Sequence, residues 1–190
     1  MVKQQEEIQQ VYDKYGNMNL HIIGNTICYE KINSHYKIVI TNEEEAIKFL
    51  SRHGNIVNDY DGVMVTSGSQ QIMDFMAKCL CDEGDVVVCE NPSFLGALNA
   101  FKSNGVKLVG VDMDDDGINI AKLEEALKMP KKPKFIYLIP NFQNPTGITT
   151  SLEKRKAIYA LAKKYQVLIL EDDPYGDLRF RNKAIPSIKS

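Results

Sequence analysis

The stretch VLILEDDPY, residues 167–175, decides the interpretation of the rest of this chain. Its first half, from Val167 to Leu170, is entirely aliphatic, the pattern of a strand that is buried on both faces of a parallel sheet. Acidic residues and Pro174 then end the strand, so charged side chains stand at its carboxyl end, where open α/β sheets bind ligands. Because burying an unpaired carboxylate is costly, an acid held there needs a cationic or proton-donating partner.

Strand patterns alternate with helix patterns between Gly62 and Leu170. Short aliphatic runs predict strands at 63–65, 86–88, 106–111, 135–139 and 167–170. Apolar residues at helical spacing predict helices at 70–81, 94–101, 123–127 and 152–164. The pattern Thr150-x-x-Glu153 indicates a capping box at the start of the last helix. This alternation is typical of an α/β layer fold with a mainly parallel sheet.

The first part of the chain, residues 1–42, has a less regular pattern than residues 43–190, and we divide the chain there. Helical spacing and short apolar runs predict a helix at 3–14 and strands at 20–23, 26–29 and 36–40. A second helix is expected between Thr41 and Gly54, because acids follow its polar start. The sequence leaves the role of residues 1–42 open.

Composition limits the classes of partner. The 190 residues carry a net charge of −2, which gives no electrostatic reason to expect nucleic acid or an anionic membrane surface. No run approaches the roughly 20 apolar residues that a membrane span needs, so we expect a cytoplasmic protein. The four cysteines have neither a metal-ligand spacing nor a disulfide framework, and we expect reduced thiols.

The acidic turn at 112–117 opens like a calcium-binding loop. Its twelfth position, however, is Leu123, where such a loop requires an acid. We therefore expect no metal site, and interpret the turn as a solvated one.

Polar and aromatic residues follow several predicted strands. The segment Thr66–Gln70 joins a strand to a helix, and its glycine between hydroxyls suits a phosphate group, although an ordinary N-cap has the same pattern. Asn144 precedes Pro-Thr-Gly, which is either a simple turn or a means of pointing the amide into a crevice. Phe94 is either a core residue or a ring that stacks on a planar ligand. Together these strand ends suit a planar ring that carries a phosphate.

The motifs at these strand ends resemble those of the class I/II aminotransferases of fold type I, which use pyridoxal 5′-phosphate (PLP). They are VTSGSQQ at 65–71, NPSF at 91–94, PNFQNPTG at 140–147 and EDDPY at 171–175. The resemblance covers about residues 43–190 and is greatest to the α-aminoadipate and kynurenine aminotransferase branch. It implies an incomplete three-layer α/β/α large domain, PLP as cofactor, and an amino acid and a 2-oxo acid as substrates.

The resemblance also implies roles for matching positions. By it, Ser69 and Gln70 contact the cofactor phosphate, and Phe94 stacks on the cofactor ring.

The catalytic positions that the resemblance implies are Asp172 and Tyr175. Tyr175 and Asn144 correspond to the pair that hydrogen-bonds the phenolic oxygen of the ring. Asp172 corresponds to the carboxylate under the pyridinium nitrogen, where an ionised acid keeps the nitrogen protonated.

Family members place the Schiff-base lysine in an S-x-S-K type segment after a further strand, and residues 1–190 do not reach that segment. Lys189 lies before the position of that strand, so we do not expect it to be this lysine. We therefore expect a cofactor-binding portion that is inactive alone, from a family of homodimers. The open edge of the strand at 63–65 would be covered by the strands between 20 and 41 or by a second chain.

Two other interpretations stay open. One is the aminotransferase-like effector domain of a transcription regulator, which binds PLP without turnover, although residues 1–60 show no basic recognition helix. The other is a pseudo-enzyme that keeps only the fold.

Overall fold

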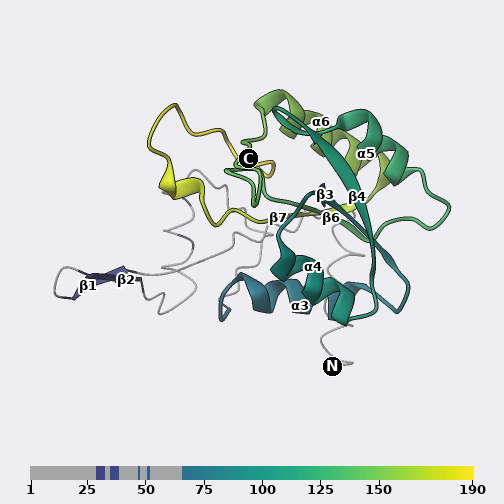
Figure 1. Ribbon diagram of the computed structural model, residues 1–190, viewed down its shortest axis with the longest axis horizontal. Coiled ribbons are helices and arrows are strands. Elements are labelled where there is room, and N and C mark those ends of the chain that lie inside the picture. The colour runs from purple at the N-terminus through teal and green to yellow at the C-terminus, as the bar shows by residue number, and fades with distance from the viewer. Residues whose placement is uncertain (1–28, 33–34, 39–46, 48–50, 52–65) are drawn as a thin grey trace.

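The computed structural model describes residues 29–32, 35–38, 47, 51 and 66–190 (Figure 1). Its helices and strands are, in chain order, β1 (Tyr29–Ile32), β2 (His35–Ile38), α3 (Ser69–Leu80), β3 (Val86–Asn91), α4 (Leu95–Ser103), β4 (Lys107–Asp114), β5 (Gly117–Ile118), α5 (Ile120–Leu127), β6 (Phe135–Leu138), α6 (Leu152–Tyr165), β7 (Leu168–Glu171) and the 3-10 helix η1 (Gly176–Leu178).

The N-terminal predictions are tested only in part. β1 and β2 pair as an antiparallel hairpin, and β2 overlaps the strand predicted at 36–40. The strand predicted at 26–29 shares only Tyr29 with β1. The helices predicted at 3–14 and 41–54 and the strands predicted at 20–23 and 63–65 lie outside the described residues or almost wholly so.

The larger sheet has the strand order β5-β4-β3-β6-β7. β3 pairs in parallel with both β4 and β6, β6 pairs in parallel with β7, and the short β5 alone runs antiparallel, against the end of β4. The mainly parallel sheet predicted from the alternating pattern is thereby confirmed. Because β3, β6 and β7 are parallel neighbours, their carboxyl ends meet at one edge of the sheet.

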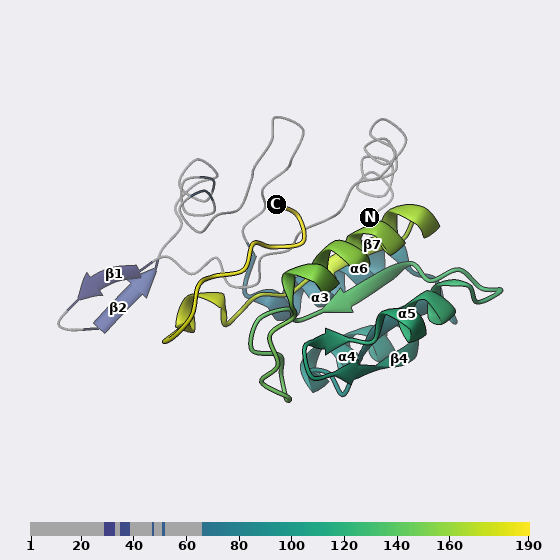
Figure 2. The same cartoon turned by 90° about the horizontal axis from the view of Figure 1, so that it is seen from above.

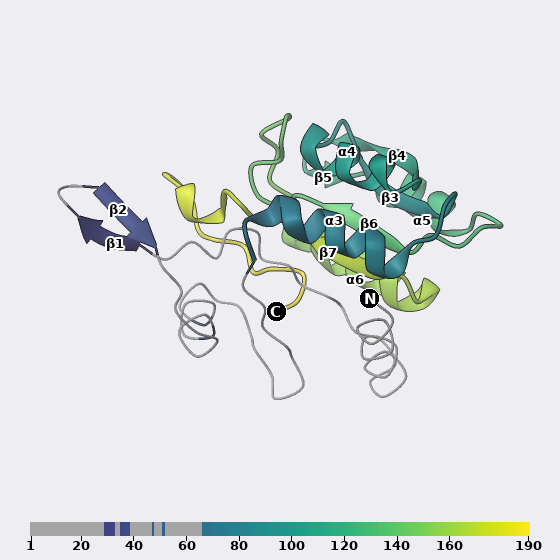
Figure 3. The ribbon, with the colours of Figure 1, turned by 90° about the horizontal axis from the view of Figure 1, so that it is seen from below.

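Helices cover both faces of this sheet, which gives the three layers α/β/α (Figure 1). α3 and α4 pack on one face, and α5 and α6 pack on the other, as the views from above and below show (Figures 2 and 3). The aliphatic runs of β3, β6 and β7 are buried on both faces, as their unbroken apolar sequences predicted.

Several element boundaries differ from the prediction. α6 begins after Ser151, whose Oγ accepts the backbone N–H of Lys154 at 3.3 Å, so the cap is one residue later than Thr150. Thr150 is 2% exposed, and its side chain lies next to Gly117 instead. β3 runs on to Asn91, because its backbone continues to pair with β4 beyond the aliphatic residues.

The acidic turn between β4 and β5 is tied to neighbouring helices by lysines. Lys154 Nζ of α6 lies 2.6 Å from Asp114 and 2.9 Å from Asp116. Lys122 Nζ of α5 lies 2.7 Å from Asp112. The turn is therefore ion-paired, where the sequence predicted only a solvated turn. Separately, none of the helices in the described part of the chain is both long and apolar enough to cross a membrane.

Candidate functional site

Asp172 is the buried acid that the sequence placed at the end of β7, and it is 2% exposed. Its Oδ2 accepts a hydrogen bond of 2.9 Å from the hydroxyl of Tyr137. Its Oδ1 is buried and has no hydrogen-bond partner within the described part of the chain. Burial raises the pKa of Asp172 to about 6; the Tyr137 hydrogen bond opposes this, and the charge of Asp173 adds to it. A ligand group that donates a proton to this oxygen would satisfy it and stabilise the buried carboxylate.

Tyr137 is the protein partner of this acid, and sequence reasoning missed it. It lies on β6, the neighbour of β7, and is fully buried. Burial and the adjacent charge of Asp172 raise the pKa of Tyr137, so its hydroxyl keeps its proton and can donate it. Within the apolar run of the strand, a tyrosine was the only available signal of a buried polar group, since its hydroxyl needs a partner.

Asn144 and Tyr175 meet across two loops. The Nδ2 of Asn144, in the loop after β6, donates a 3.1 Å hydrogen bond to the hydroxyl of Tyr175, in the segment after β7. Tyr175 also packs against the core between the sheet and α3 and α4. The resemblance implied that both residues contact one oxygen of the cofactor ring, and the structure brings them together although they are 31 positions apart in the chain.

Gln70 and Phe94 form a second contact, between α3 and α4. The Nε2 of Gln70 donates a 3.0 Å hydrogen bond to the carbonyl of Gly96. A Cβ added at Gly96 would overlap the ring of Phe94 and come within 2.9 Å of Gln70 Oε1. The absence of a side chain at Gly96 thus lets the Phe94 ring lie over the start of α4, next to Gln70. The sequence predicted Phe94 as the first residue of this helix, but in the structure Phe94 is the N-cap of α4.

Ser69 is the first residue of α3. The N-cap is Gly68, at φ 81°, and no side chain of the described residues caps this helix end. The hydroxyls predicted to flank the turn act locally, since Thr66 donates to the Gly68 carbonyl at 3.2 Å. The N–H groups of the first turn are therefore not blocked by a side-chain cap, and a helix end of this kind favours an anion.

Glu90 and Gln143 connect the loops that carry Phe94 and Asn144. Glu90 is 1% exposed, and its Oε2 accepts from the backbone N–H of Ile139 at 3.0 Å and from Gln143 Nε2 at 3.2 Å. The same Nε2 also donates to the carbonyl of Pro92 at 2.8 Å. Burial raises the pKa of Glu90 to about 8, and the charge of Asp172 raises it further. The hydrogen bonds from Ile139 and Gln143 oppose this rise. Glu90 follows an aliphatic strand just as Asp172 does, so the same signal could have found it.

Arg155 of α6 holds the Asn144 loop from the opposite face of the sheet. It is 2% exposed, and its guanidinium donates to the carbonyls of Thr150, Pro140 and Pro186, each at 3.0 Å, and to Asn141 Oδ1 at 2.7 Å. Burial lowers the pKa of Arg155. Its helical spacing to the buried residues of α6 placed it on the apolar face, and that was the available sequence signal.

The structure therefore brings the predicted site residues together in two groups. Asp172 and the Asn144–Tyr175 pair lie at the ends of β6 and β7, and Gln70 and Phe94 lie between α3 and α4. Phe94 and Tyr175 both pack against the core on the α3 and α4 face, so the groups share one side of the sheet.

A family model for aminotransferase class I and II matches residues 31–189. Aromatic-amino-acid aminotransferase 1 of Thermococcus litoralis is 42% identical over 132 residues, which are 67% of this chain and 32% of the relative. An uncharacterized HTH-type transcriptional regulator of Bacillus subtilis is 38% identical over 128 residues, which are 67% of this chain and 26% of the regulator. The chain thus spans about a third or less of these curated relatives.

A solved structure has the same fold. The crystal structure of α-aminoadipate aminotransferase from Thermus thermophilus, complexed with N-(5′-phosphopyridoxyl)-L-leucine, matches with a TM-score of 0.67 and 37% identity. The match covers 75% of this chain and 36% of that one. Because the family model matches most of its residues and the arrangement of its helices and strands agrees, this chain belongs to the class I and II aminotransferases.

Proposed function

We propose that this chain is the PLP-binding portion of an aminotransferase that transfers an amino group between an amino acid and a 2-oxo acid. Family membership supports the reaction type, and the solved relative with a phosphopyridoxyl ligand supports the cofactor. The chain spans about a third of the Thermococcus litoralis relative, so we assign the reaction to the whole enzyme and only cofactor binding to this chain.

The observation that carries the proposal is the Oδ1 of Asp172, which is buried and has no hydrogen-bond partner among the residues that the structure describes. A buried carboxylate oxygen without a donor is costly, and a protonated ring nitrogen would remove that cost. The Asn144–Tyr175 pair lies in the adjacent loops and can offer donors to an oxygen on the same ring. The uncapped start of α3 suits a phosphate. The residues present therefore fit PLP.

When bound, PLP supplies an electron sink for the negative charge left when an amino acid loses its α-proton. The protein's part is to hold the charges that favour this. Asp172 would keep a proton on the ring nitrogen, and Tyr137, by donating to Asp172, would fix the orientation of the carboxylate and favour its ionised form. Phe94 would exclude water from one face of the ring.

The test is a titration of the chain with PLP, followed by absorbance and fluorescence, with Asp172→Asn as the variant and Asp173→Asn as its matched neighbour. Asparagine keeps the shape of each side chain and removes its charge. Loss of one charge-assisted hydrogen bond at Asp172 should weaken PLP binding about 10- to 100-fold, while Asp173→Asn should have a smaller effect. Equal effects of the two variants, or no saturable binding by the unaltered chain, would reject the proposal.

A second candidate is the effector domain of a transcription regulator, which the Bacillus subtilis relative favours. Both candidates bind PLP, so binding alone does not separate them. The gene on either side of residues 1–190 does: a downstream S-x-S-K segment supports the enzyme, and an upstream winged helix supports the regulator.

We further propose a homodimer in the cytoplasm. The free cysteines among the described residues, Cys79, Cys81 and Cys89, are consistent with a reducing compartment. Light scattering on the purified protein and fractionation of cells test the two parts separately, and a monomer or an exported protein would contradict them.

A further inference from the structure

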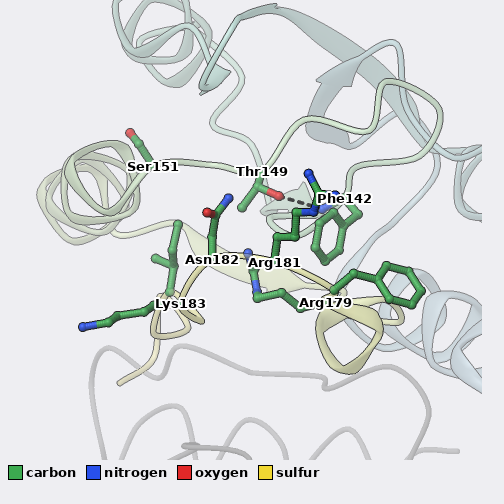
Figure 4. A pocket seen from close by; sticks show the side chains of 9 residues that line it. Phe142, Thr149, Ser151, Arg179, Arg181, Asn182 and Lys183 are labelled. Atoms are coloured by element: carbon green, nitrogen blue, oxygen red, sulfur yellow. Dashed lines mark hydrogen bonds between the residues drawn. The ribbon is translucent and has the colours of Figure 1, made fainter.

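A cavity of about 510 Å³ lies between the loop after β6 and the segment after η1, and Asp172, Asn144 and Tyr175 are not among its lining residues. Phe142 and Thr149 line it from the β6 side, and Arg179, Arg181 and Asn182 line it from the C-terminal segment (Figure 4). Lys183 also belongs to the lining but extends away from the two arginines. A cavity of this volume is within the range that accommodates small organic ligands.

Arg179, Arg181 and Lys183 line the cavity, and no acid is among the lining residues whose side chains the structure describes. Among those described side chains, no carboxylate lies within ion-pairing distance of either arginine. Asp116 accepts from the Oγ of Ser151, a lining residue, at 2.9 Å and is already paired with Lys154 at 2.9 Å. The described lining therefore carries a net positive charge, which favours an anion.

Arg179 is held in place before any ligand arrives. Its guanidinium lies 4.8 Å from the centre of the Phe142 ring, and one of its terminal nitrogens donates to Asn141 Oδ1 at 3.3 Å. Its Nε is buried and has no acceptor among the described residues. A fixed guanidinium with an unused donor is suited to a planar carboxylate or a phosphate, which can accept two parallel hydrogen bonds.

We propose that this cavity binds a small organic anion, with a phosphate or carboxylate group at Arg179 and Arg181 and an apolar body against Phe142 and Phe180. Phe180 is 97% exposed, and a bound apolar group would remove part of that surface from water. None of the described lining residues is a predicted cofactor-site residue, so this proposal does not depend on the proposed function.

Calorimetric titration at fixed ionic strength tests the proposal, with phenyl phosphate and benzoate as organic anions and inorganic phosphate as the bare head group. The variant is Arg181→Gln, because Arg181 is exposed and no hydrogen bond or ion pair joins its side chain to the described residues. The matched control is Lys132→Gln, which removes the same charge from an exposed position outside the cavity.

We expect the organic anions to bind more tightly than inorganic phosphate. Arg181→Gln should weaken their binding about fivefold or more, and Lys132→Gln should leave it unchanged. Binding that is equal in the unaltered chain and in Arg181→Gln would place the anion elsewhere, for example at the start of α3, and would overturn the proposal. So would the absence of saturable binding, or phenyl phosphate that binds no better than phosphate.

Discussion

Replacing Glu90 by glutamine should make the stability of this protein less sensitive to alkaline pH. Glu90 is 1% exposed; its Oε2 accepts two hydrogen bonds, and its Oε1 is buried without a partner among the described residues. Burial raises the pKa of Glu90 from 4.5 to about 8. A group whose pKa is raised on folding contributes stability that is complete below its unfolded pKa and is lost as pH rises through its folded pKa.

The magnitude follows from these two pKa values. Between about pH 5 and about pH 9, ionisation of Glu90 should remove about 4 kcal/mol from the free energy of unfolding. Glutamine does not titrate, and its amide oxygen can still accept from Ile139 and Gln143. The variant should therefore match the unaltered chain within about 1 kcal/mol near pH 5 and exceed it by several kcal/mol near pH 9.

Urea denaturation of both proteins across this pH range measures the effect, with Glu125→Gln on the exposed side of α5 as the control. Subtracting the two curves removes the titration of Asp172 and other groups that both proteins share. A difference between Glu90→Gln and the unaltered chain that stays constant with pH would show that Glu90 is already ionised in the folded protein, and the account of its burial would be wrong.

Other predictions concern the supports of the site. Arg155→Lys keeps the charge but not the planar set of donors, so we expect urea denaturation to show a loss of about 3–5 kcal/mol in the free energy of unfolding. A loss below about 1 kcal/mol would show that the hydrogen bonds of Arg155 do not stabilise the loop. Gly96→Ala should displace the Phe94 ring and weaken PLP binding about three- to tenfold while stability changes by no more than about 1 kcal/mol; unchanged PLP affinity would remove Phe94 from the cofactor site.

Much of the fold was predictable from the sequence because buried parallel strands have an unmistakable composition. The aliphatic runs of β3, β6 and β7 and the helices between them appear where the pattern predicted. The boundaries were less predictable, because they depend on backbone pairing and caps. Ser151, not Thr150, caps α6, and the Thr150 side chain is buried next to Gly117.

The site residues divide in the same way. Asp172, Asn144 and Tyr175 could be predicted because they stand in motifs at strand ends, and a parallel sheet brings strand ends together. Their roles toward PLP stay predictions. Tyr137, the donor to Asp172, was not found, because nothing in a strand sequence says which neighbour it will face.

The sequence by itself determined the layered α/β arrangement and the edge of the sheet at which polar residues gather, because periodicity and composition are local properties of the chain. Only the tertiary structure decided which of those groups are paired. Glu90 bonds to Gln143, which is 53 positions away in the chain, and Arg155 bonds to acceptors 5 to 31 positions away; the folding of the loops over the sheet sets these contacts. Hydrogen-bond partners and the pKa values they shift depend on burial and distance in space, and neither can be read from neighbours in sequence.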